Sequence, residues 1–414
     1  MRVLVFTTLY PNPEEPHHGV FVENRLRHAL AVSGDTARVV APVPWFPIRD
    51  PRFGSYAAQA RVPRNDERYG IPIDHPRYPV LPKIGMSLAP YLLYIAVRGH
   101  LRSLLAAGET FDLLDAHYFY PDGVAAALLA REFSLPLVIT GRGTDLNLIP
   151  RYRLPRRAIR WAAERANGLV TVCAALRDDL ADVGVDPERV CVLRNGVDLA
   201  MFRRDQGART RLRLGLEPPV LLSVGRLIPR KGHDLAIRAL AALGRGSLYV
   251  VGEGPEEASL RMLAESFGVG ERVVFVGRVP HDELSQFYSA ADVLVLASSR
   301  EGWPNVLLES MACGTPVAAT NVNGTPEVVQ APEAGRVAAA RTVDGLAEAI
   351  GDVLTLAPEP GDVRRYAEQF SWDATAEGQN ALFTRVAGRP RPEAATGEYD
   401  NAAGRRDGAS GDHV

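Results

Sequence analysis

The chain has 414 residues, of which 46% are hydrophobic and 23% are charged, and its formal net charge is −2. These values are typical of a soluble globular protein long enough for two domains, and they give no electrostatic reason to expect a nucleic-acid partner. The best candidate for a membrane-spanning helix, residues 89–97, is soon interrupted by Arg98 and Arg102. It therefore falls short of the ~18 apolar residues that a spanning helix needs.

The cysteines and the first residues bear on the cellular compartment. Cys173, Cys191 and Cys313 are odd in number, lie in apolar patterns and show no metal-ligand spacing. We expect buried, reduced thiols, which fits a cytoplasmic protein. The start, Met-Arg-Val-Leu-Val-Phe-Thr-Thr, is too short for a signal peptide and is predicted to be a first strand.

Strand and helix patterns alternate along the first half of the chain. Strands are predicted at residues 3–8, 38–41, 71–78, 112–118, 137–140, 168–172 and 189–193, and helices at 20–31 and 87–107. The residues from 42 to 63 are rich in proline and arginine, and we expect a long irregular loop there.

The pattern restarts after residues 199–219, a polar and arginine-rich stretch that we interpret as an interdomain linker. Further strands are predicted at 220–225, 248–251, 273–276, 291–296 and 317–319. Two successive sets of alternating units predict two doubly wound α/β domains, residues 1–198 and 220–370, that face each other across a cleft. A final helix at 371–387 precedes a polar tail, 388–414, which we expect to be disordered.

Two carboxylates mark the stretch from Ala297 to Pro316. Glu301 lies in the loop after a buried strand, and Glu309 lies eight residues later on a short helix that begins near Asn305. Ligands bind at the carboxyl ends of the strands in open α/β sheets, and the first N–H groups of a helix hold phosphates or hydroxyls. A glutamate near a helix start is also ordinary complementarity to the helix dipole.

Two cations follow the first strand of the second domain. Arg226 and Lys231 lie five residues apart in Gly-Arg-Leu-Ile-Pro-Arg-Lys-Gly, and Lys231 is one of only two lysines in the chain. A guanidinium fork and an ammonium point charge can hold a diphosphate from two sides. The alternative is ordinary positive charge at a surface turn.

These motifs, with Met-Ala-Cys-Gly-Thr-Pro-Val at 311–317 and Gly-Thr-Pro-Glu at 324–327, resemble the donor-site signature of family 4 retaining glycosyltransferases. The resemblance spans residues 1–387 and implies a GT-B fold of two Rossmann-like domains, with the final helix crossing back to the first. His-Gly-Val-Phe at 18–21 and Tyr-Pro-Asp-Gly at 120–123 are similar to members that build bacterial cell-surface polysaccharides. The resemblance implies a nucleotide-sugar donor and a saccharide acceptor, lipid-linked at the cytoplasmic membrane face.

The resemblance also assigns roles to single residues. Arg226 and Lys231 would stabilise the leaving diphosphate, Glu301 would lie near the donor sugar, and Glu309 would accept hydrogen bonds from the ribose. Further donor contacts are expected from Gly19, Gly254, Arg278 and Gly302, and from the backbone N–H groups around Val306 and Leu307.

Two strand-end residues of the first domain have two readings each. His117 matches a histidine with which the family contacts the donor sugar, although a lone histidine at a strand end is often structural. Asp145 lies in a loop similar to the acceptor-side loop of the family, and it could bind a sugar hydroxyl or cap the next helix.

Several patterns limit the chemistry. No Asp-x-Asp occurs in the chain, so we expect no metal cofactor, and no fingerprint of a dinucleotide oxidoreductase is present. Trp303-Pro304 stands where the family often has Phe-Gly, which puts the identity of the sugar in doubt. The alternatives are a sugar-nucleotide epimerase or hydrolase of the same architecture, and a non-catalytic sugar-nucleotide-binding regulator. A pure binder has no need for groups that favour departure of the diphosphate, which argues against the regulator.

One stretch, Arg151–Arg165, is strongly basic. Apolar residues are interleaved with its six arginines, at positions 151, 153, 156, 157, 160 and 165. Such a pattern is usually the solvated face of a helix, but it also suits an interfacial helix on an anionic membrane. The protein would then be peripheral on the inner face of the cell membrane.

Overall fold

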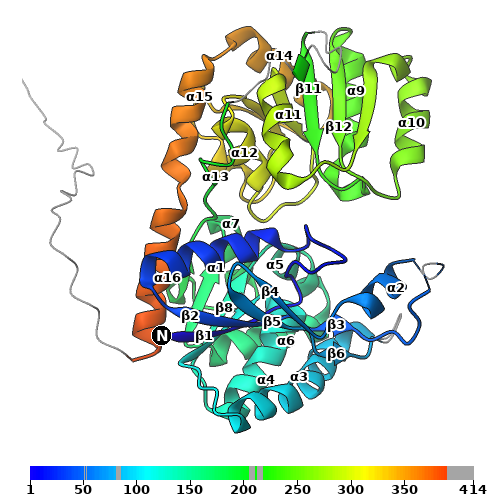
Figure 1. Cartoon of the computed structure of the whole chain (residues 1–414). Coiled ribbons are helices and arrows are strands. Elements are labelled where there is room, and N and C mark those ends of the chain that lie inside the picture. Colours follow the sequence, from blue (N-terminus) through cyan, green and yellow to red (C-terminus); the bar gives the residue numbers. More distant parts are fainter. Residues whose placement is uncertain (51, 53, 81–84, 205–209, 212–217, 389–414) are drawn as a thin grey trace, which may run out of the picture.

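The alternating patterns form two large and mostly parallel β-sheets, one in each half of the chain, with helices on both faces (Figure 1). The computed structural model describes residues 1–388 except 51, 53, 81–84, 205–209 and 212–217. Three neighbouring strands in each sheet are buried along their whole length, since helices cover both faces of each sheet. The predicted fold class, two Rossmann-like α/β domains, is confirmed.

The first sheet has eight strands in the order β10-β9-β8-β7-β1-β2-β5-β4. All neighbours are parallel except β4 and β5, which pair antiparallel. The strands are β1 (Arg2–Phe6), β2 (Thr36–Val40), β4 (Asn65–Arg68), β5 (Ile71–Asp74), β7 (Leu113–His117), β8 (Leu137–Gly141), β9 (Gly168–Thr171) and β10 (Val190–Val192).

The second sheet has six parallel strands in the order β13-β12-β11-β14-β15-β16. The order reverses at β11, which lies between β12 and β14, so the carboxyl end of β11 is a topological switch point where α/β proteins bind ligands. The strands are β11 (Val220–Val224), β12 (Ser247–Val251), β13 (Val273–Gly277), β14 (Val293–Leu296), β15 (Val317–Thr320) and β16 (Gly335–Ala338).

Helices cover both sheets, and one of them ties the end of the described chain to its beginning. The helix α16 (Trp372–Val386) packs against α1 (Val20–Ser33) in the first domain (Figure 1). The buried Arg25 of α1 anchors this contact by donating from Nη1 to Leu193 O at 2.9 Å and from Nε to Gln379 Oε1 at 2.5 Å.

The helices of the first domain are α1 (Val20–Ser33), α2 (Gly54–Arg61), α3 (Ala89–Ala106), α4 (Val124–Phe133), α5 (Thr144–Asn147), α6 (Arg153–Arg165) and α7 (Ala174–Asp182). Those that follow are α9 (His233–Leu243), α10 (Glu257–Ser266), α11 (Leu284–Ala290), α12 (Asn305–Ala312), α13 (Thr325–Val328), α14 (Val343–Leu356), α15 (Pro360–Ala367) and α16 (Trp372–Val386).

Two predictions about residues 42–78 are wrong. The expected long loop contains β3 (Val43–Pro44) and α2, and the expected strand 71–78 is divided into β5 and β6 (Arg77–Tyr78). The division falls at His75-Pro76, because proline has no N–H to continue a ladder. The short strand β6 pairs with β3 in a separate two-stranded sheet.

Three further expectations concern the cysteines, the membrane and the polar segments. Cys173 and Cys313 are buried, free thiols, whereas Cys191 is only half-buried. Among the described residues, no helix is both long and apolar enough to cross a bilayer. The predicted tail, apart from Gly388, and most of the predicted linker lie outside the described residues.

Candidate active site

Three cavities lie along the boundary between the two domains, and we name each after one lining residue. The Gly225 cavity has a volume of about 600 Å³, the Glu309 cavity about 230 Å³ and the Arg142 cavity about 310 Å³. The first two share His281, and the last two share Val306, so the three adjoin one another. The row follows the carboxyl ends of the strands, where the sequence predicts the ligand.

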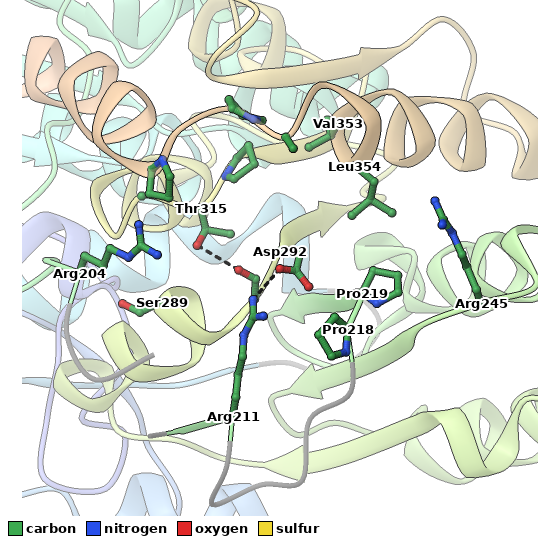
Figure 2. A pocket seen from close by; sticks show the side chains of 16 residues that line it. Arg204, Arg211, Pro218, Pro219, Arg245, Ser289, Asp292, Thr315, Val353 and Leu354 are labelled. Atoms are coloured by element: carbon green, nitrogen blue, oxygen red, sulfur yellow. Dashed lines mark hydrogen bonds and ion pairs between the residues drawn. The ribbon is translucent and has the colours of Figure 1, made fainter. Parts of the chain in front are cut away.

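A fourth cavity, of about 410 Å³, opens at the opposite ends of the strands of the second sheet (Figure 2). Pro219 and Asp292, which directly precede β11 and β14, line it, and Arg211 Nη2 pairs with Asp292 Oδ1 at 2.5 Å. This cavity therefore lies at the amino ends of the strands, away from the candidate site.

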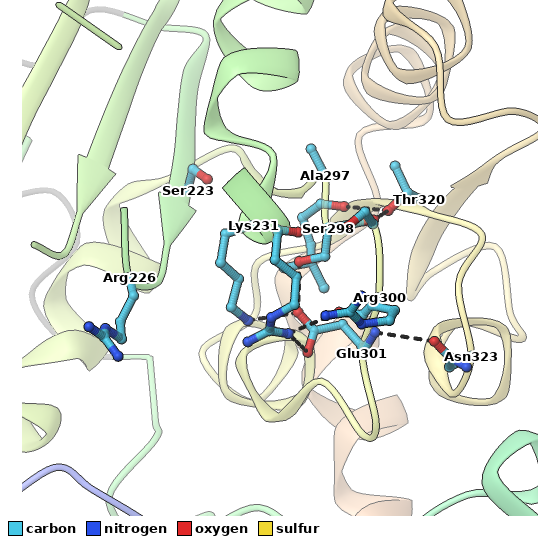
Figure 3. A network of polar contacts seen from close by, with 12 residues as sticks. Ser223, Arg226, Lys231, Ala297, Ser298, Arg300, Glu301, Thr320 and Asn323 are labelled. Carbon is cyan, nitrogen blue, oxygen red and sulfur yellow. Dashed lines mark hydrogen bonds and ion pairs between the residues drawn. The ribbon is translucent and has the colours of Figure 1, made fainter. Parts of the chain in front are cut away.

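Glu301 is the centre of a polar network in the Arg142 cavity (Figure 3). Its Oε1 accepts hydrogen bonds from Lys231 Nζ and from Ser298 Oγ, both at 2.7 Å, and Arg230 Nη1 lies 3.4 Å from Oε2. Burial alone would raise the pKa of Glu301, but the charges of Lys231 and Arg230 lower it. The carboxylate is therefore ionised and held in one position.

Arg226 does not join this network. Figure 3 shows its side chain lying apart from the pair of Lys231 and Glu301, and it lines the Gly225 cavity. The predicted pair of cations therefore does not converge on one point in this structure. The second cation beside Lys231 is Arg230, an arginine inside the same motif that the sequence reasoning did not select.

Glu309 lies on α12 and lines its own cavity together with Asn305 and Val306. Its Oε2 accepts a hydrogen bond from Tyr288 at 2.8 Å, and its Oε1 lies 3.2 Å from His281 Nε2. Although burial opposes it, the bond to Glu309 raises the pKa of His281. Both oxygens thus have protein partners, and a ribose would share or displace them.

The start of α12 is not an open row of N–H groups. Leu307 is buried, and its N–H donates to Pro304 O at 3.0 Å. Val306 instead lines both the Glu309 and the Arg142 cavity. Of the two predicted backbone contacts, Val306 is therefore the one that faces the site.

The predicted donor-side residues Gly19, Gly254 and Arg278 all line the Gly225 cavity. Gly19 has φ +72°, and a Cβ there would lie 2.3 Å from Leu9 O, so no other residue fits the present backbone. Arg278 is paired with Glu253 at 2.7 Å on the surface. The structure thus brings these three residues to one cavity, next to Arg226.

His117 lies beneath the Arg142 cavity and does not line it. Its side chain is 2% exposed, Arg142 Nη2 donates to its Nδ1 at 2.8 Å, and its Nε2 lies 3.2 Å from Asp115 Oδ2. Burial lowers the pKa of His117 to about 4, so the ring is neutral and Nδ1 can accept from the guanidinium. In this structure the ring therefore faces Arg142 and not the cavity, and His117 holds the guanidinium of Arg142 in place.

Asp145 is fully buried, and its carboxylate accepts hydrogen bonds from three backbone N–H groups, those of Phe119, Arg142 and Gly143, at 2.7 to 3.2 Å. Of the two readings, the geometry favours the structural one. Asp145 shapes the loop that carries Arg142, and it presents no oxygen to the cavity in this structure.

Contacts with the first domain hold the loop that carries Glu301. Asn147 Nδ2 donates to Glu301 O at 3.1 Å, and Trp303 Nε1 donates to Asn195 O at 2.9 Å. A Cβ on Gly302 would lie 1.9 Å from Arg142 O, so the two domains meet at this glycine. Trp303 is 6% exposed, so it is packed between the domains and also forms part of the cavity wall.

The sequence reasoning missed Arg142 and Asn195, which line the Arg142 cavity from the first domain. Arg142 Nη1 donates to Asn195 Oδ1 at 3.2 Å, and Asn195 Nδ2 donates in turn to Asn305 Oδ1 at 3.2 Å. A weak signal was available, since Arg142 stands between two glycines directly after a buried strand. Among the described residues, no group of three or more His, Cys, Asp or Glu is placed to hold a metal ion.

Comparison with known proteins assigns this architecture to a family. The description "Glycosyltransferase Family 4" matches residues 25–201, and "Glycosyl transferases group 1" matches residues 206–370. The chain belongs to the family 4 glycosyltransferases. The predicted resemblance is therefore confirmed. The two matches correspond to the two halves of this family 4 chain, each of which contains one of the two large sheets.

Two curated relatives are similar over most of this glycosyltransferase. A D-inositol 3-phosphate glycosyltransferase of Acidothermus cellulolyticus is 34% identical over 297 residues, which are 65% of this chain and 66% of that one. The chain thus spans about two thirds of that relative. The putative teichuronic acid biosynthesis glycosyltransferase TuaC of Bacillus subtilis is 28% identical over 78% of this chain and 82% of its own.

Solved structures show the same two-domain fold, which confirms the GT-B prediction. Sucrose-phosphate synthase from Thermosynechococcus elongatus superposes with a TM-score of 0.77 at 22% identity, covering 94% of this chain and all of that one. HepE of Anabaena, solved in complex with UDP, superposes with a TM-score of 0.70 at 22% identity, covering 93% of this chain and all of that one.

Proposed function

We propose that the protein transfers a sugar from a nucleotide-sugar donor to a saccharide acceptor, with retention of the anomeric configuration and without a metal. The observation that carries the proposal is the ion pair between the half-buried Lys231 and the buried Glu301, which lines a cavity between the two domains of this family 4 chain. An ammonium ion fixed at 2.7 Å by a carboxylate is preorganised to receive negative charge that develops beside it.

The reaction builds charge that these groups match. As the bond between the anomeric carbon and the diphosphate oxygen breaks, its electron pair passes to the diphosphate, where Lys231 and Arg226 would stabilise it. The acceptor hydroxyl oxygen forms the new bond on the same face, and its proton leaves with the diphosphate. Glu301 would hold Lys231 and lie against the sugar, and Glu309 would accept from the ribose.

Support for the donor comes from a structural neighbour. HepE of Anabaena was solved with UDP and with UDP-glucose, so uridine nucleotides are the first to be tested. Here the Gly225 and Glu309 cavities would take the nucleotide, and the Arg142 cavity would take the sugar and the acceptor. In this assignment the cations of the second domain replace a metal at the diphosphate.

We further propose a lipid-linked saccharide acceptor and a peripheral position on an anionic membrane. TuaC is named for teichuronic acid biosynthesis, which supports a role in cell-surface polysaccharide synthesis. The basic helix α6 supports the membrane contact, because Tyr152 and Leu154 at its start are 53% and 60% exposed among its arginines.

The test is a transfer assay with UDP-, GDP- and ADP-sugars and a saccharide acceptor mixture, in the presence of a chelator. Nucleotide release that depends on acceptor, with a glycosidic product of unchanged anomeric configuration by NMR, is expected. Release that is lost in chelator and restored by Mg²⁺ or Mn²⁺ would contradict the metal-free mechanism. Conversion of the donor without acceptor would favour the hydrolase or epimerase, and binding without turnover would favour a regulator.

A further inference from the structure

The Arg142 cavity has more positive charge than a diphosphate clamp needs. Four cationic side chains line it, and Glu301 is the single carboxylate among the lining residues, which leaves three positive charges uncompensated. The four are Arg142, Arg230, Lys231 and Arg300. The proposed function uses only Lys231 from this cavity, since Arg226 lines the Gly225 cavity instead.

Two of these guanidinium groups each have one buried nitrogen without a hydrogen-bond partner among the described residues. These nitrogens are the Nε atoms of Arg142 and Arg300. Arg142 is only 8% exposed, and its other two nitrogens donate to the neutral groups of His117 and Asn195. A buried, unpaired donor costs ~1–3 kcal/mol, and more when the group is charged, so a ligand that supplies the missing acceptor would bind with advantage.

Other charges close to Arg142 do not cancel it. Burial and the neighbouring Arg25 lower the pKa of Arg142 to about 9, while Asp115 and Asp145 act in the opposite direction. The guanidinium therefore keeps its charge at neutral pH. Neither carboxylate accepts a hydrogen bond from the Arg142 side chain, because Asp115 lies beside His117 and Asp145 is bonded to backbone N–H groups.

The origin of the cations shows which substrate they face. Arg300 and Arg230 come from the second domain, where Arg230 Nη1 donates to Arg300 O at 2.9 Å. Arg142 comes from the loop between β8 and α5 of the first domain. In the proposed function the nucleotide lies in the Gly225 and Glu309 cavities, neither of which Arg142 lines, so Arg142 faces the cavity that takes the acceptor.

We propose that the Arg142 cavity binds an anionic group, a phosphate or a carboxylate, on the acceptor sugar. This inference rests on the proposed function and names its substrate class. Both anions accept hydrogen bonds from the planar fork of an arginine. Such an anion would supply the acceptors that the Nε atoms of Arg142 and Arg300 now lack.

The experiment compares methyl glucoside, glucose 6-phosphate and glucuronate by titration calorimetry on the full chain with saturating UDP. Because UDP occupies the diphosphate site, an anionic sugar must bind elsewhere. We expect glucose 6-phosphate, glucuronate or both to bind ~10-fold or more tightly than methyl glucoside, with an advantage that shrinks as salt rises. Which of the two anions gains identifies the phosphate or the carboxylate. Equal affinity of all three sugars would overturn the inference.

Variants locate the anion. Arg142→Gln and Arg300→Gln should each remove most of the advantage and leave UDP affinity unchanged. The control is Arg245→Gln, an exposed arginine on the fourth cavity (Figure 2), which should keep the advantage. Loss in Arg245→Gln alone would place the anion in the fourth cavity and refute the proposal. If Arg142→Gln does not fold, Arg300→Gln decides, and an undiminished advantage there counts against the cavity.

Two further measurements distinguish failure of this inference from failure of the proposed function. A preference for UDP-glucuronate over UDP-glucose that Arg142→Gln abolishes, with no preference among free sugars, would assign the anion to the donor and overturn the inference. The absence of binding to UDP, GDP and ADP would overturn the proposed function, and the inference with it. Nucleotide binding without any preference for anionic sugars overturns the inference alone.

Discussion

At the scale of single residues, the site separates groups that act on developing charge from groups that bind throughout. Lys231 should stabilise the leaving diphosphate only as the bond breaks, whereas Glu309 should hold ribose equally before and during reaction. We expect Lys231→Ala to lower kcat by ~10²–10³, the usual cost of one preorganised charge partner. Glu309→Gln should mainly raise the KM for the donor, because an amide cannot accept from both hydroxyls as a carboxylate does.

Steady-state kinetics on purified variants measure both effects. Lys231→Ala also leaves Glu301 buried without its ammonium partner, so the melting temperature of each variant is recorded in parallel. An unchanged kcat in Lys231→Ala, with the fold intact, would show that this ammonium is not the electrophile.

His117 is a positioning residue whose effect should pass through Arg142. His117→Ala removes the acceptor at 2.8 Å from Arg142 Nη2 and leaves the nucleotide cavities untouched. We expect turnover to fall far more than nucleotide affinity, with a rise in the KM for the acceptor. His117→Asn, whose amide oxygen can accept from Arg142, should recover part of the turnover. Near-normal turnover in His117→Ala would show that the ring only fills the core.

The residue scale also shows what the sequence could and could not predict. Glu301, Lys231 and Glu309 were identified because each stands in a local motif at the end of a strand. Arg142 and Asn195 were not, since their partners are residues far away in the chain, and the contacts depend on how the two domains meet. The inward turn of Asp145 was equally hidden, because one of its three donors, Phe119 N–H, lies beyond the end of a neighbouring strand.

At the scale of elements, strands with apolar runs were predictable and charged ones were not. β8 and β14 are buried along their whole length, and they carry the continuous apolar runs Leu-Val-Ile and Val-Leu-Val-Leu. β4 has the sequence Asn-Asp-Glu-Arg and lies at the edge of its sheet, where charge prevents pairing with other chains, so it has no apolar signal. The helix α2, of mixed alanine and polar composition, was missed for a similar reason.

The basic helix α6 is the element expected to bind the membrane. Some of its arginines have partners within the protein: Arg160 pairs with Glu164 at 3.0 Å, and Arg156 donates to Asp182 O. We expect sedimentation with vesicles containing acidic lipid at low salt, and weaker binding as salt rises. Replacing Arg153, Arg156, Arg157 and Arg160 with Gln should abolish it without unfolding.

A matched control replaces four exposed arginines outside α6 with Gln, and this variant should still sediment; they are Arg177, Arg261, Arg278 and Arg365. Binding that does not respond to salt, or equal loss in the control, would refute a specific role for this helix.

The contact between the Glu301 loop and the first domain can be tested by replacing Gly302 with alanine and by comparing a control glycine, Gly351. Gly302→Ala places a Cβ 1.9 Å from Arg142 O and should force the domains apart at the Arg142 cavity, with a large loss of transfer activity. Gly351 lies inside the helix α14 with open space around it. Gly351→Ala should therefore raise the free energy of unfolding by ~0.5–1 kcal/mol and keep activity. Normal kinetics in Gly302→Ala would show that the domains need not meet there for turnover.

At the scale of the whole molecule, buried titratable groups set how the fold responds to acid. Burial lowers the pKa of His117 and of His233 to about 4 each, below the ~6.5 of an exposed histidine. Burial raises the pKa of Asp122 to about 7, while its carboxylate accepts hydrogen bonds from Thr8 N and Oγ1. The two histidines and the aspartate therefore act in opposite directions on stability.

The signs follow from which state binds more protons. Between pH 6.5 and 4 the unfolded chain protonates both histidines while the folded chain does not, so folding weakens as pH falls, by up to about 3 kcal/mol for each histidine. Asp122 is protonated in the folded chain below about pH 7 but in the unfolded chain only near pH 4, so this group strengthens folding over the same range. With two histidines against one aspartate, we expect the melting temperature to fall from pH 6.5 to pH 4.

Asp122→Asn removes the opposing group and keeps an oxygen that can accept from Thr8 N. Its melting temperature should therefore fall more steeply between pH 6.5 and 4.5 than that of the unmodified chain. Asp178→Asn, at a carboxylate with a side chain 68% exposed, is the surface control and should follow the unmodified curve. Thermal unfolding at four pH values across this range measures the slopes. Parallel curves for Asp122→Asn and the unmodified chain would mean that Asp122 ionises in the folded protein as it does in the unfolded one, and that the hydrogen bonds from Thr8 outweigh its burial.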